Sequence, residues 1–293
     1  MSVKRLKSYR RLTQAACLIF IFLVPILNIL RYDIDSKELY ILGSVWTLGL
    51  PSNTFTDMSA QGSAAVAIRF VLKAVLPWFL VLTVFPILGF FFGRFACGWL
   101  CPEGALFELT EFLTLKLIGR RNIYMKKIND PAIKLGNPFL YGLISILFLT
   151  TVPPITGTFL TGFFIAPSEI WREITQHQIG IGLYTGIIGV TIYMWITSIF
   201  VRHIFCRYVC AAGLMQTLFG WLSPYSLRIK FDRKNSSRCT DCKGCEKICF
   251  MDVKPRLPRK DINCVNCGEC LVACERELGE GNNLFSFKFG KKE

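Results

Sequence analysis

Eight of the thirteen cysteines lie in two runs near the end of the sequence, CTDCKGCEKIC and CVNCGECLVAC. Both runs have the spacing Cys-x2-Cys-x2-Cys-x3-Cys. In bacterial ferredoxins with this spacing, three thiolates of one run bind a [4Fe–4S] cluster and the fourth binds the neighbouring cluster. The sequence therefore predicts two [4Fe–4S] clusters, the first held by Cys239, Cys242, Cys245 and Cys274 and the second by Cys264, Cys267, Cys270 and Cys249.

Zinc is the alternative occupant of these runs, because Cys-x2-Cys pairs also bind zinc. Zinc modules usually combine two such pairs and not two runs of four cysteines, so the spacing favours clusters. The runs depart from the bacterial pattern at one position each. A proline commonly follows the fourth cysteine, whereas Phe250 and Glu275 stand there in this sequence. We expect this difference to change local hydrogen bonding and cluster potential more than ligation.

Four more cysteines form two Cys-x3-Cys pairs inside an internal repeat, while Cys17 stands alone. Residues 94–113, RFACGWLCPEGALFELTEFL, align without gaps on residues 203–222, HIFCRYVCAAGLMQTLFGWL. Side chains four residues apart share one face of a helix, so each pair could present two sulfurs together. A pseudo-twofold arrangement of the repeats would bring four sulfurs to one site, those of Cys97, Cys101, Cys206 and Cys210.

Several kinds of chemistry fit four soft thiolates at such a site. They could bind a third cluster or another metal, form a dithiol–disulfide relay, or handle copper. Packing where two helices meet is the alternative without a redox role, because free cysteine is often buried. The repetition of the pair at one offset favours a functional site. Pro102 follows the first pair and Ala211 the second, so the two pairs need not have the same geometry.

The elements that must position these cysteines are mostly membrane spans. The chain has 293 residues, 52% of them hydrophobic and only 18% charged, which is too apolar for a soluble domain of this length. About 20 apolar residues cross a hydrocarbon core of about 30 Å. A weaker apolar stretch over residues 39–56 is broken by glycine and proline, and we interpret it as interfacial or re-entrant. The four predicted spans cover residues 12–30, 74–93, 138–157 and 182–201.

The formal net charge of +14 comes from lysine and arginine in particular segments. Nucleic-acid binding is one interpretation of a basic chain, but here the basic residues flank apolar runs. They gather before the first span, between residues 94 and 137, and after residue 202. The positive-inside rule then places both ends in the cytoplasm. A fifth span over residues 39–56 would invert the orientation of every later segment and put the basic connections outside, so the charge asymmetry rejects it. The first apolar run is expected to stay in the membrane as an anchor and not to be removed as a signal peptide.

The predicted fold class is an α-helical membrane protein with four transmembrane helices in two pseudo-symmetric halves, followed by a small α+β domain of the bacterial 2[4Fe–4S] ferredoxin type. The composition changes abruptly after Pro224, where apolar runs end and charged residues become frequent. The expected boundaries are residues 1–224 for the membrane domain, with its two Cys-x3-Cys motifs, and 225–293 for the cytoplasmic domain.

The order of these features resembles the NapH family of membrane quinol dehydrogenase components, whose relatives include MauN and the iron–sulfur modules of NosR and CcoG. The resemblance rests on FACGWLCPEGAL, FCRYVCAAGL and the paired runs of the tail. The family motif is Cys-x3-Cys-Pro, and Ala211 departs from it in the second copy. The resemblance implies a multi-pass protein of the bacterial inner membrane that oxidises menaquinol or ubiquinol and passes electrons to a partner iron–sulfur or cytochrome protein of a respiratory reductase.

Quinol oxidation requires groups that accept protons, and the candidates are Glu169, Glu173 and His177, which follow the third span. The sequence has only two histidines, His177 and His203, so a haem with two histidine ligands is not expected. The alternative function is a copper-reducing or cofactor-maturation factor that uses the four membrane cysteines. A redox sensor is a third hypothesis. The expected partners are lipid, the quinone pool and a redox protein, with no nucleic acid.

Overall fold

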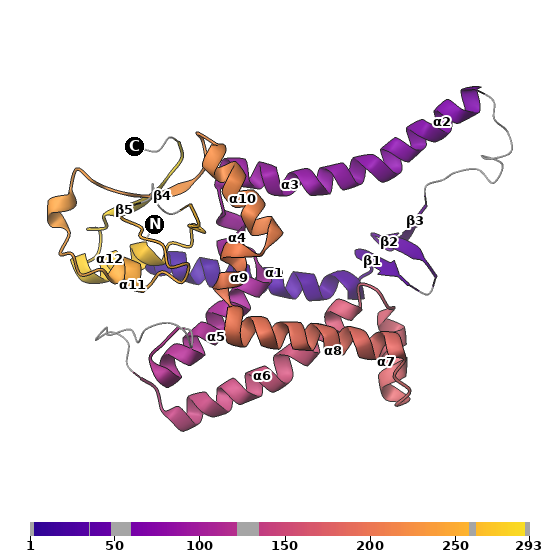
Figure 1. Cartoon of the computed structure of the whole chain (residues 1–293), viewed down its shortest axis with the longest axis horizontal. Coiled ribbons are helices and arrows are strands. Elements are labelled where there is room, and N and C mark those ends of the chain that lie inside the picture. Colours follow the sequence, from indigo (N-terminus) through magenta and orange to yellow (C-terminus); the bar gives the residue numbers. More distant parts are fainter. Residues whose placement is uncertain (1–2, 35, 48–59, 122–134, 258–261, 291–293) are drawn as a thin grey trace.

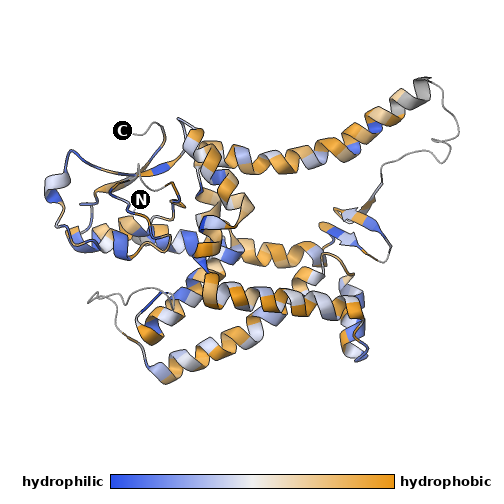
Figure 2. Ribbon diagram, viewed as in Figure 1, coloured by the Kyte–Doolittle hydropathy of each residue, from blue (hydrophilic) through white to orange (hydrophobic). Residues whose placement is uncertain are grey.

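The computed structural model describes residues 3–34, 36–47, 60–121, 135–257 and 262–290. Four of its helical segments are long and apolar enough to cross a membrane, by length and composition. Their bounds are Arg5–Ile26, Val66–Phe92, Pro138–Thr161 and Ile181–Val201. These segments overlap the four predicted spans, although the first two begin earlier than predicted. Figure 2 shows the apolar residues concentrated along them.

The first span belongs to α1 (Val3–Ile26), which runs along the length of the molecule (Figure 1). The second combines α2 (Ala60–Phe70), a π-helical turn (Val71–Val75) and α3 (Leu76–Phe92). The third span is α6 (Pro138–Thr161). The fourth is α8 (Ile181–Ile196) with a second π-helical turn (Thr197–Val201). The beginning of α1 and the last strand lie at the same end of the molecule.

Small residues allow two pairs of helices to approach closely. A Cβ atom at Gly157 of α6 would lie 2.9 Å from the carbonyl oxygen of Ile187, so only glycine permits this contact with α8. In the same way, Gly89 of α3 contacts the backbone of Gln216 in α10 (Ala211–Leu222). Packing through small residues is usual between helices in membranes. Only 6% of the apolar window of the second span is buried, against 22% for each of the other three, so α3 stands apart from the other spans.

The end of the molecule far from the tail carries a three-stranded antiparallel sheet, with the order β1-β2-β3, and helix α7 (Pro167–Thr175). The strands are Leu30–Asp33, Glu38–Ile41 and Ser44–Trp46. The described part of residues 39–56, for which we predict an interfacial or re-entrant position, forms β2 and β3. That position stays a prediction. Leu42 and Gly43 connect these strands with positive φ angles of 50° and 79°, which suits a two-residue hairpin loop. Residues 48–56 lie outside the described part.

The two copies of the internal repeat share an unusual backbone turn at their start. Gly93 has φ 60° and ψ −137°, and Arg202, at the matching position, has φ 47° and ψ −132°. This conformation is strained for a residue with a side chain. The Arg202 guanidinium holds it by donating to the carbonyl oxygen of Ser198 and to Thr114 Oγ1, at 2.8 Å each. The span packing differs between the halves, since α3 packs on α10 whereas α8 packs mainly on α6. The pseudo-twofold arrangement stays a prediction.

The tail consists of β4 (Arg228–Phe231), a short 3-10 turn (Ser236–Arg238), α11 (Gly244–Lys247), α12 (Glu269–Leu278) and β5 (Phe285–Lys288). Strands β4 and β5 pair antiparallel. Leu6 of α1 and Trp99, which follows the second span, are buried in the same core as Ile229, Cys245, Cys270, Leu271 and Phe285 of the tail. The predicted domain of residues 225–293 thus shares its core with the membrane domain.

Candidate iron–sulfur centres

The two cysteine runs of the tail have the same local backbone conformation. The residues on either side of the second cysteine have positive φ angles in both runs: Asp241 and Lys243 in the first, Asn266 and Gly268 in the second. Asp and Asn adopt the left-handed region more readily than most residues, and glycine adopts it freely. The residues between the cysteines therefore favour this loop conformation, in addition to the spacing of the cysteines themselves.

The first set of cysteines surrounds one pocket. Cys239, Cys242 and Cys245 of the first run line it together with Cys274, the last cysteine of the second run. Apolar walls come from Phe231 and Phe285 of the strands. The fourth cysteine therefore crosses over to the other run, as the spacing predicts for a cluster shared in this way.

The second set gathers around a small apolar cluster made by Met251, Val253 and Val265. Cys249 packs there with Cys264 and Cys267, and Cys270 lies within electrostatic range of all three. Burial raises the pKa of the Cys267 and Cys270 thiols well above the usual range. Without a cation, these thiols are neutral at pH 7.

The donor sets fit iron–sulfur clusters, which supply one-electron transfer when bound. Each set consists of four sulfurs, three of them from one loop, in surroundings that are largely apolar. Within the described residues, no three His, Cys, Asp or Glu side chains are grouped closely enough for a single metal ion. A cluster core is larger than one ion, so its ligands stand further apart. Ligation by these eight cysteines stays a prediction.

The Cys-x3-Cys pairs differ from the predicted geometry, because neither pair lies on one continuous helix. Cys97 lies in α4 (Phe95–Trp99), and Cys101 is the N-cap of α5 (Pro102–Ile118). In the second copy, Cys206 lies in α9 (His203–Tyr208) and Cys210 is the N-cap of α10. Both N-caps are extended, with ψ 117° and 113°. Pro102 explains the break in the first copy, since proline disfavours helical backbone in the residue before it. The second copy breaks at the same place with Ala211.

The four sulfurs nevertheless gather in one region. Cys206 lies within electrostatic range of the other three thiols, and Cys97 lies in range of Cys210. Burial raises the pKa of the Cys101 thiol to about 11 and that of Cys206 further still. Burial also raises the pKa of the Cys97 thiol, and the charge of the buried Arg94 guanidinium opposes this rise. Arg94 also donates to the carbonyl oxygen of Cys206 at 2.5 Å. A cation or cluster bound here would have to displace protons from these thiols.

The first membrane pair lies against the second set of tail cysteines. Cys97 packs on the same Met251, Val253 and Val265 cluster as Cys249, Cys264 and Cys267. Trp99 Nε1 donates to the carbonyl oxygen of Asn266 at 2.9 Å, and Phe95 stacks on the Trp99 ring at 4.9 Å. The Cys97 thiol also donates to Gln216 Oε1 at 3.4 Å. The membrane pairs and the second set therefore form one continuous region.

Gly98 decides how closely these two parts approach. A Cβ atom at this position would lie 2.3 Å from the carbonyl oxygen of Val265, in the loop between Cys264 and Cys267. We expect Gly98→Ala to separate α4 from that loop and to lower the apparent Tm of the tail and its iron content. Gly189→Ala is the control, because a Cβ there meets nothing within 4 Å. Equal Tm and iron content in the two variants would contradict the close contact.

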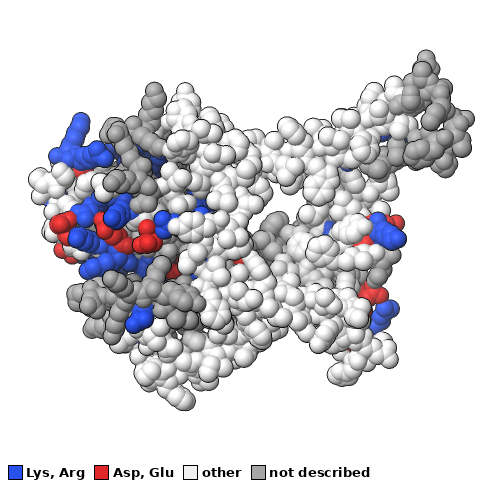
Figure 3. Space-filling model, viewed as in Figure 1, with Lys and Arg blue, Asp and Glu red and all other residues white. Residues whose placement is uncertain are grey.

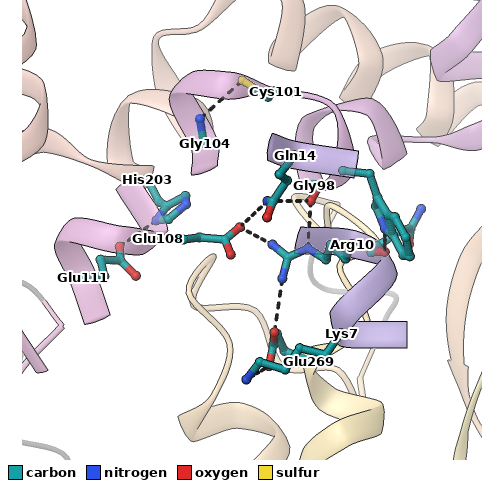
Figure 4. Close-up of polar contacts among 12 residues, drawn as sticks. Lys7, Arg10, Gln14, Gly98, Cys101, Gly104, Glu108, Glu111, His203 and Glu269 are labelled. Carbon is teal, nitrogen blue, oxygen red and sulfur yellow. Dashed lines mark hydrogen bonds and ion pairs between the residues drawn. The ribbon is translucent and has the colours of Figure 1, made fainter. Parts of the chain in front are cut away.

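A buried polar network fixes α1 between α5 and the tail (Figure 4). Arg10 is only 3% exposed, and its guanidinium pairs with Glu108 of α5 and with Glu269 of α12. Its Nε atom donates to the carbonyl oxygen of Gly98 at 2.9 Å. Gln14 donates to Glu108 Oε1 at 3.2 Å. Burial raises the pKa of Glu108, and the charge of Arg10 opposes this shift. No motif or spacing predicts this network, because its members lie far apart along the chain.

The second histidine takes part in a similar contact. His203 Nδ1 lies 2.6 Å from Glu111 Oε1, and both side chains are buried. The imidazole also packs on the ring of Phe250, at 4.4 Å, directly after Cys249. Phe250, which replaces the usual proline, thus connects the second set to a buried His–Glu pair. Within the described residues, His203 Nε2 has no hydrogen-bond partner.

The candidates for quinol proton transfer lie elsewhere. Glu169 and Glu173 are on α7, at the end of the molecule opposite the tail (Figure 1). Glu169 pairs with Arg172 at 2.6 Å, and Glu173 Oε2 accepts from the Gly180 amide at 2.8 Å. His177 is exposed in the turn after α7 and has φ 53°. The structure does not bring these residues to the cysteines, and their role in proton transfer stays a prediction.

Comparison with known families supports iron–sulfur chemistry. Residues 74–121 and 183–231 each match the family described as a 4Fe-4S binding domain. Each matched segment contains one Cys-x3-Cys pair, and the eight tail cysteines lie outside both segments. The two segments correspond to the two copies of the internal repeat. The matches therefore concern the membrane pairs, whereas the cluster spacing of the tail is a separate observation.

The chain is also similar to several whole proteins. It is 28% identical over 197 residues to the putative electron transport protein YccM of Escherichia coli K12, covering 67% of this chain and 52% of YccM. It is 29% identical over 229 residues to the uncharacterized protein MJ0750 of Methanocaldococcus jannaschii, covering 76% and 85%. The regulatory protein NosR of Stutzerimonas stutzeri is 29% identical over 186 residues, covering 60% and 22%.

The chain thus spans about half the length of YccM and less than a quarter of NosR. No solved structure matches it. Together, the domain match and these distant relatives support a ferredoxin-type family of iron–sulfur proteins whose apolar helices are long enough to span a membrane. The closer resemblance to NapH stays a prediction.

Proposed function

We propose that this chain is an iron–sulfur electron-transfer protein of the bacterial inner membrane that oxidises quinol and passes the electrons to a partner redox protein of a respiratory reductase. YccM, which is described as a putative electron transport protein, supports the general class. Quinol as the electron donor follows from the resemblance to NapH and from the apolar spans, since a lipid-soluble quinol must meet its acceptor at the membrane.

One observation carries the proposal. Cys97, directly after the second span, packs on the same apolar cluster as Cys249, Cys264 and Cys267 of the tail. Electrons that enter at the membrane surface would therefore not need to cross open solvent to reach the second set. The first set lies further out, where Cys242 is exposed. This exposed side is where a partner protein would accept electrons, and it is the side on which charged residues gather (Figure 3).

A copper-reducing or maturation function is the second candidate, and the buried group of four membrane cysteines favours it. Thiolates suit copper(I), and the Arg94 cation lies beside them. In that case, the tail would supply electrons to a metal or disulfide at the membrane pairs. The two functions differ in what the membrane pairs hold, and this can be measured.

The test is anaerobic purification of the full chain, followed by iron analysis, EPR and addition of menaquinol. We expect about 8 irons per chain for two clusters, or about 12 if the membrane pairs hold a third. Menaquinol added to the oxidised protein should reduce the clusters, as seen by EPR. Zinc in place of iron would rule out electron transfer. Clusters that menaquinol cannot reduce would contradict the quinol-linked function, and copper retained only when the four membrane cysteines are intact would support the second candidate.

A further inference from the structure

A pocket lies where the membrane domain meets the second set of cysteines. Its walls come from the end of α3, from α10, from β4 and from the loop that carries Cys264. The space between these walls is about 500 Å³, a figure that includes solvent at the open side of the pocket. Cys264, a predicted cluster ligand, forms part of the wall, so a molecule in this pocket would lie next to an iron–sulfur centre.

Hydrogen-bond donors and neutral polar groups line the inner part of this pocket. Arg94 is 1% exposed, and its Nε atom has no hydrogen-bond partner among the described residues. Gln216 adds an amide, and no Asp or Glu belongs to the lining. Arg228 adds a second guanidinium, of which Nη1 faces a ligand because Nε and Nη2 already donate to Ser226 Oγ and to the carbonyl oxygens of Gly220 and Ser223. The Asn266 amide is already engaged, because it donates to the carbonyl oxygens of Phe92 and Leu227. These donors suit the oxygen atoms of a small neutral or anionic ring.

The outer part of the pocket joins an apolar surface. Trp221 belongs to the lining and is 52% exposed. On the same helix, Leu214, Leu218 and Leu222 are exposed at spacings of three or four residues, which places them along one side of α10. Tryptophan is enriched at membrane interfaces. An apolar tail could therefore lie along α10 while its polar head enters the pocket.

We propose that this pocket binds the head ring of a quinone, with the isoprenoid tail along the exposed side of α10. The proposal rests on the proposed function and deepens it by locating the quinone. Oxidation of a bound quinol would pass two electrons, one at a time, to the cluster that Cys264 would help to hold, and would release two protons to water at the open side of the pocket, because the lining contains no carboxylate. A phospholipid head group would also meet the two guanidinium groups. The Cys264 wall favours the quinone, because a redox-active ring at this position has an electron acceptor beside it and a phosphate has no such use.

The first test is photolabelling of the full chain, with its clusters in place, in neutral phosphatidylcholine nanodiscs. The probe is an azido-benzoquinone with an isoprenoid tail, and labelled peptides are identified by mass spectrometry. We expect label in residues 211–222 or 262–266, displaced by menaquinone and not by phosphatidylglycerol. Label confined to other segments, such as α7, would overturn the assignment. Displacement by phosphatidylglycerol alone would show a lipid site in its place.

The second test fills the opening of the pocket. Ile262 is 48% exposed on the rim, and Leu257, in the same domain but outside the pocket, is 47% exposed. We expect Ile262→Trp to lower quinone labelling and menaquinol-driven cluster reduction at least about tenfold, a loss of about 1.4 kcal/mol of binding free energy. Leu257→Trp should leave both unchanged. Both variants should keep the dithionite-reduced EPR spectrum of the original protein, which separates blocked binding from a damaged fold.

Different results would contradict the quinol-linked function and the location of the quinone. If menaquinol does not reduce the clusters of the unmodified protein, the quinol-linked function is wrong. If menaquinol reduces the unmodified protein and the Ile262→Trp variant at the same rate, only the location of the quinone is wrong.

Discussion

Cys249→Ser should damage the cluster of the second run and spare the cluster of its own run. In the structure, Cys249 is the last cysteine of the first run but packs with Cys264 and Cys267 of the second run, around Met251, Val253 and Val265. Cys274 makes the reverse crossing and lines the pocket of the first run. Serine is a poorer iron ligand than a thiolate, so we expect each single substitution to lower iron by up to about half of the 8 atoms that two clusters would hold.

Double substitutions identify which cluster is lost. Cys249→Ser combined with Cys264→Ala should be no worse than Cys264→Ala alone, because both remove ligands from one cluster. Cys249→Ser combined with Cys239→Ala should remove nearly all the iron. Non-additive effects of this kind are expected between residues of one site. The measurements are iron per chain and the integrated EPR signal after reduction. The opposite pattern would place Cys249 in the cluster of its own run.

The spans and the tail runs were predictable because both depend on local sequence. About 20 uncharged apolar residues can be recognised without knowledge of the fold, and all four predicted spans overlap the apolar helices, with ends that differ by at most eight residues. The spacing of the tail cysteines also predicted which cysteines would gather, including the exchange of Cys249 and Cys274. In both cases, a short stretch of chain contains the information.

The membrane pairs show where local reasoning was insufficient. Pro102 is a sequence signal for a helix break after Cys101, but Ala211 gives no such signal, and yet the chain breaks at Cys210 as well. The hairpin at residues 38–46 was missed for a related reason. Its residues are apolar enough to resemble a membrane stretch, and the turn depends on Leu42 in an uncommon left-handed conformation before Gly43. Gly43 was the residue in this stretch that indicated a turn.

Contacts over long sequence distances could not be predicted at all. His203 pairs with Glu111, and Trp99 donates to Asn266 more than a hundred residues away. The shared core of Leu6 with the tail is of the same kind. None of these partners is marked by spacing or composition, because each depends on how the completed spans bring both ends of the chain to one side.

Arg10 should be the side chain outside the cysteines on which attachment of the tail depends most. Its guanidinium is nearly fully buried and pairs with Glu108 of α5 and with Glu269 of α12. Lys7 also pairs with Glu269, at 3.8 Å, so Glu108 is the carboxylate that loses most of its compensation when Arg10 is removed. Removing one member of a buried ion pair typically costs about 3–5 kcal/mol, since a charge is left without compensation. We expect Arg10→Met to lower the free energy of unfolding of the tail by about this amount and to accelerate cluster loss, measured by visible absorbance during thermal unfolding in detergent.

Two controls distinguish the network from a general effect of removing positive charge near the membrane. Arg11→Met changes an exposed neighbour and should leave the unfolding midpoint nearly unchanged. Arg10→Met combined with Glu108→Gln and Glu269→Gln removes the uncompensated carboxylates and should recover part of the loss, because neutral amides are cheaper to bury than charges. If the triple variant were less stable than Arg10→Met alone, the contribution of Arg10 would come from packing and from its bond to the carbonyl oxygen of Gly98, and charge compensation between α1, α5 and α12 would not be its source.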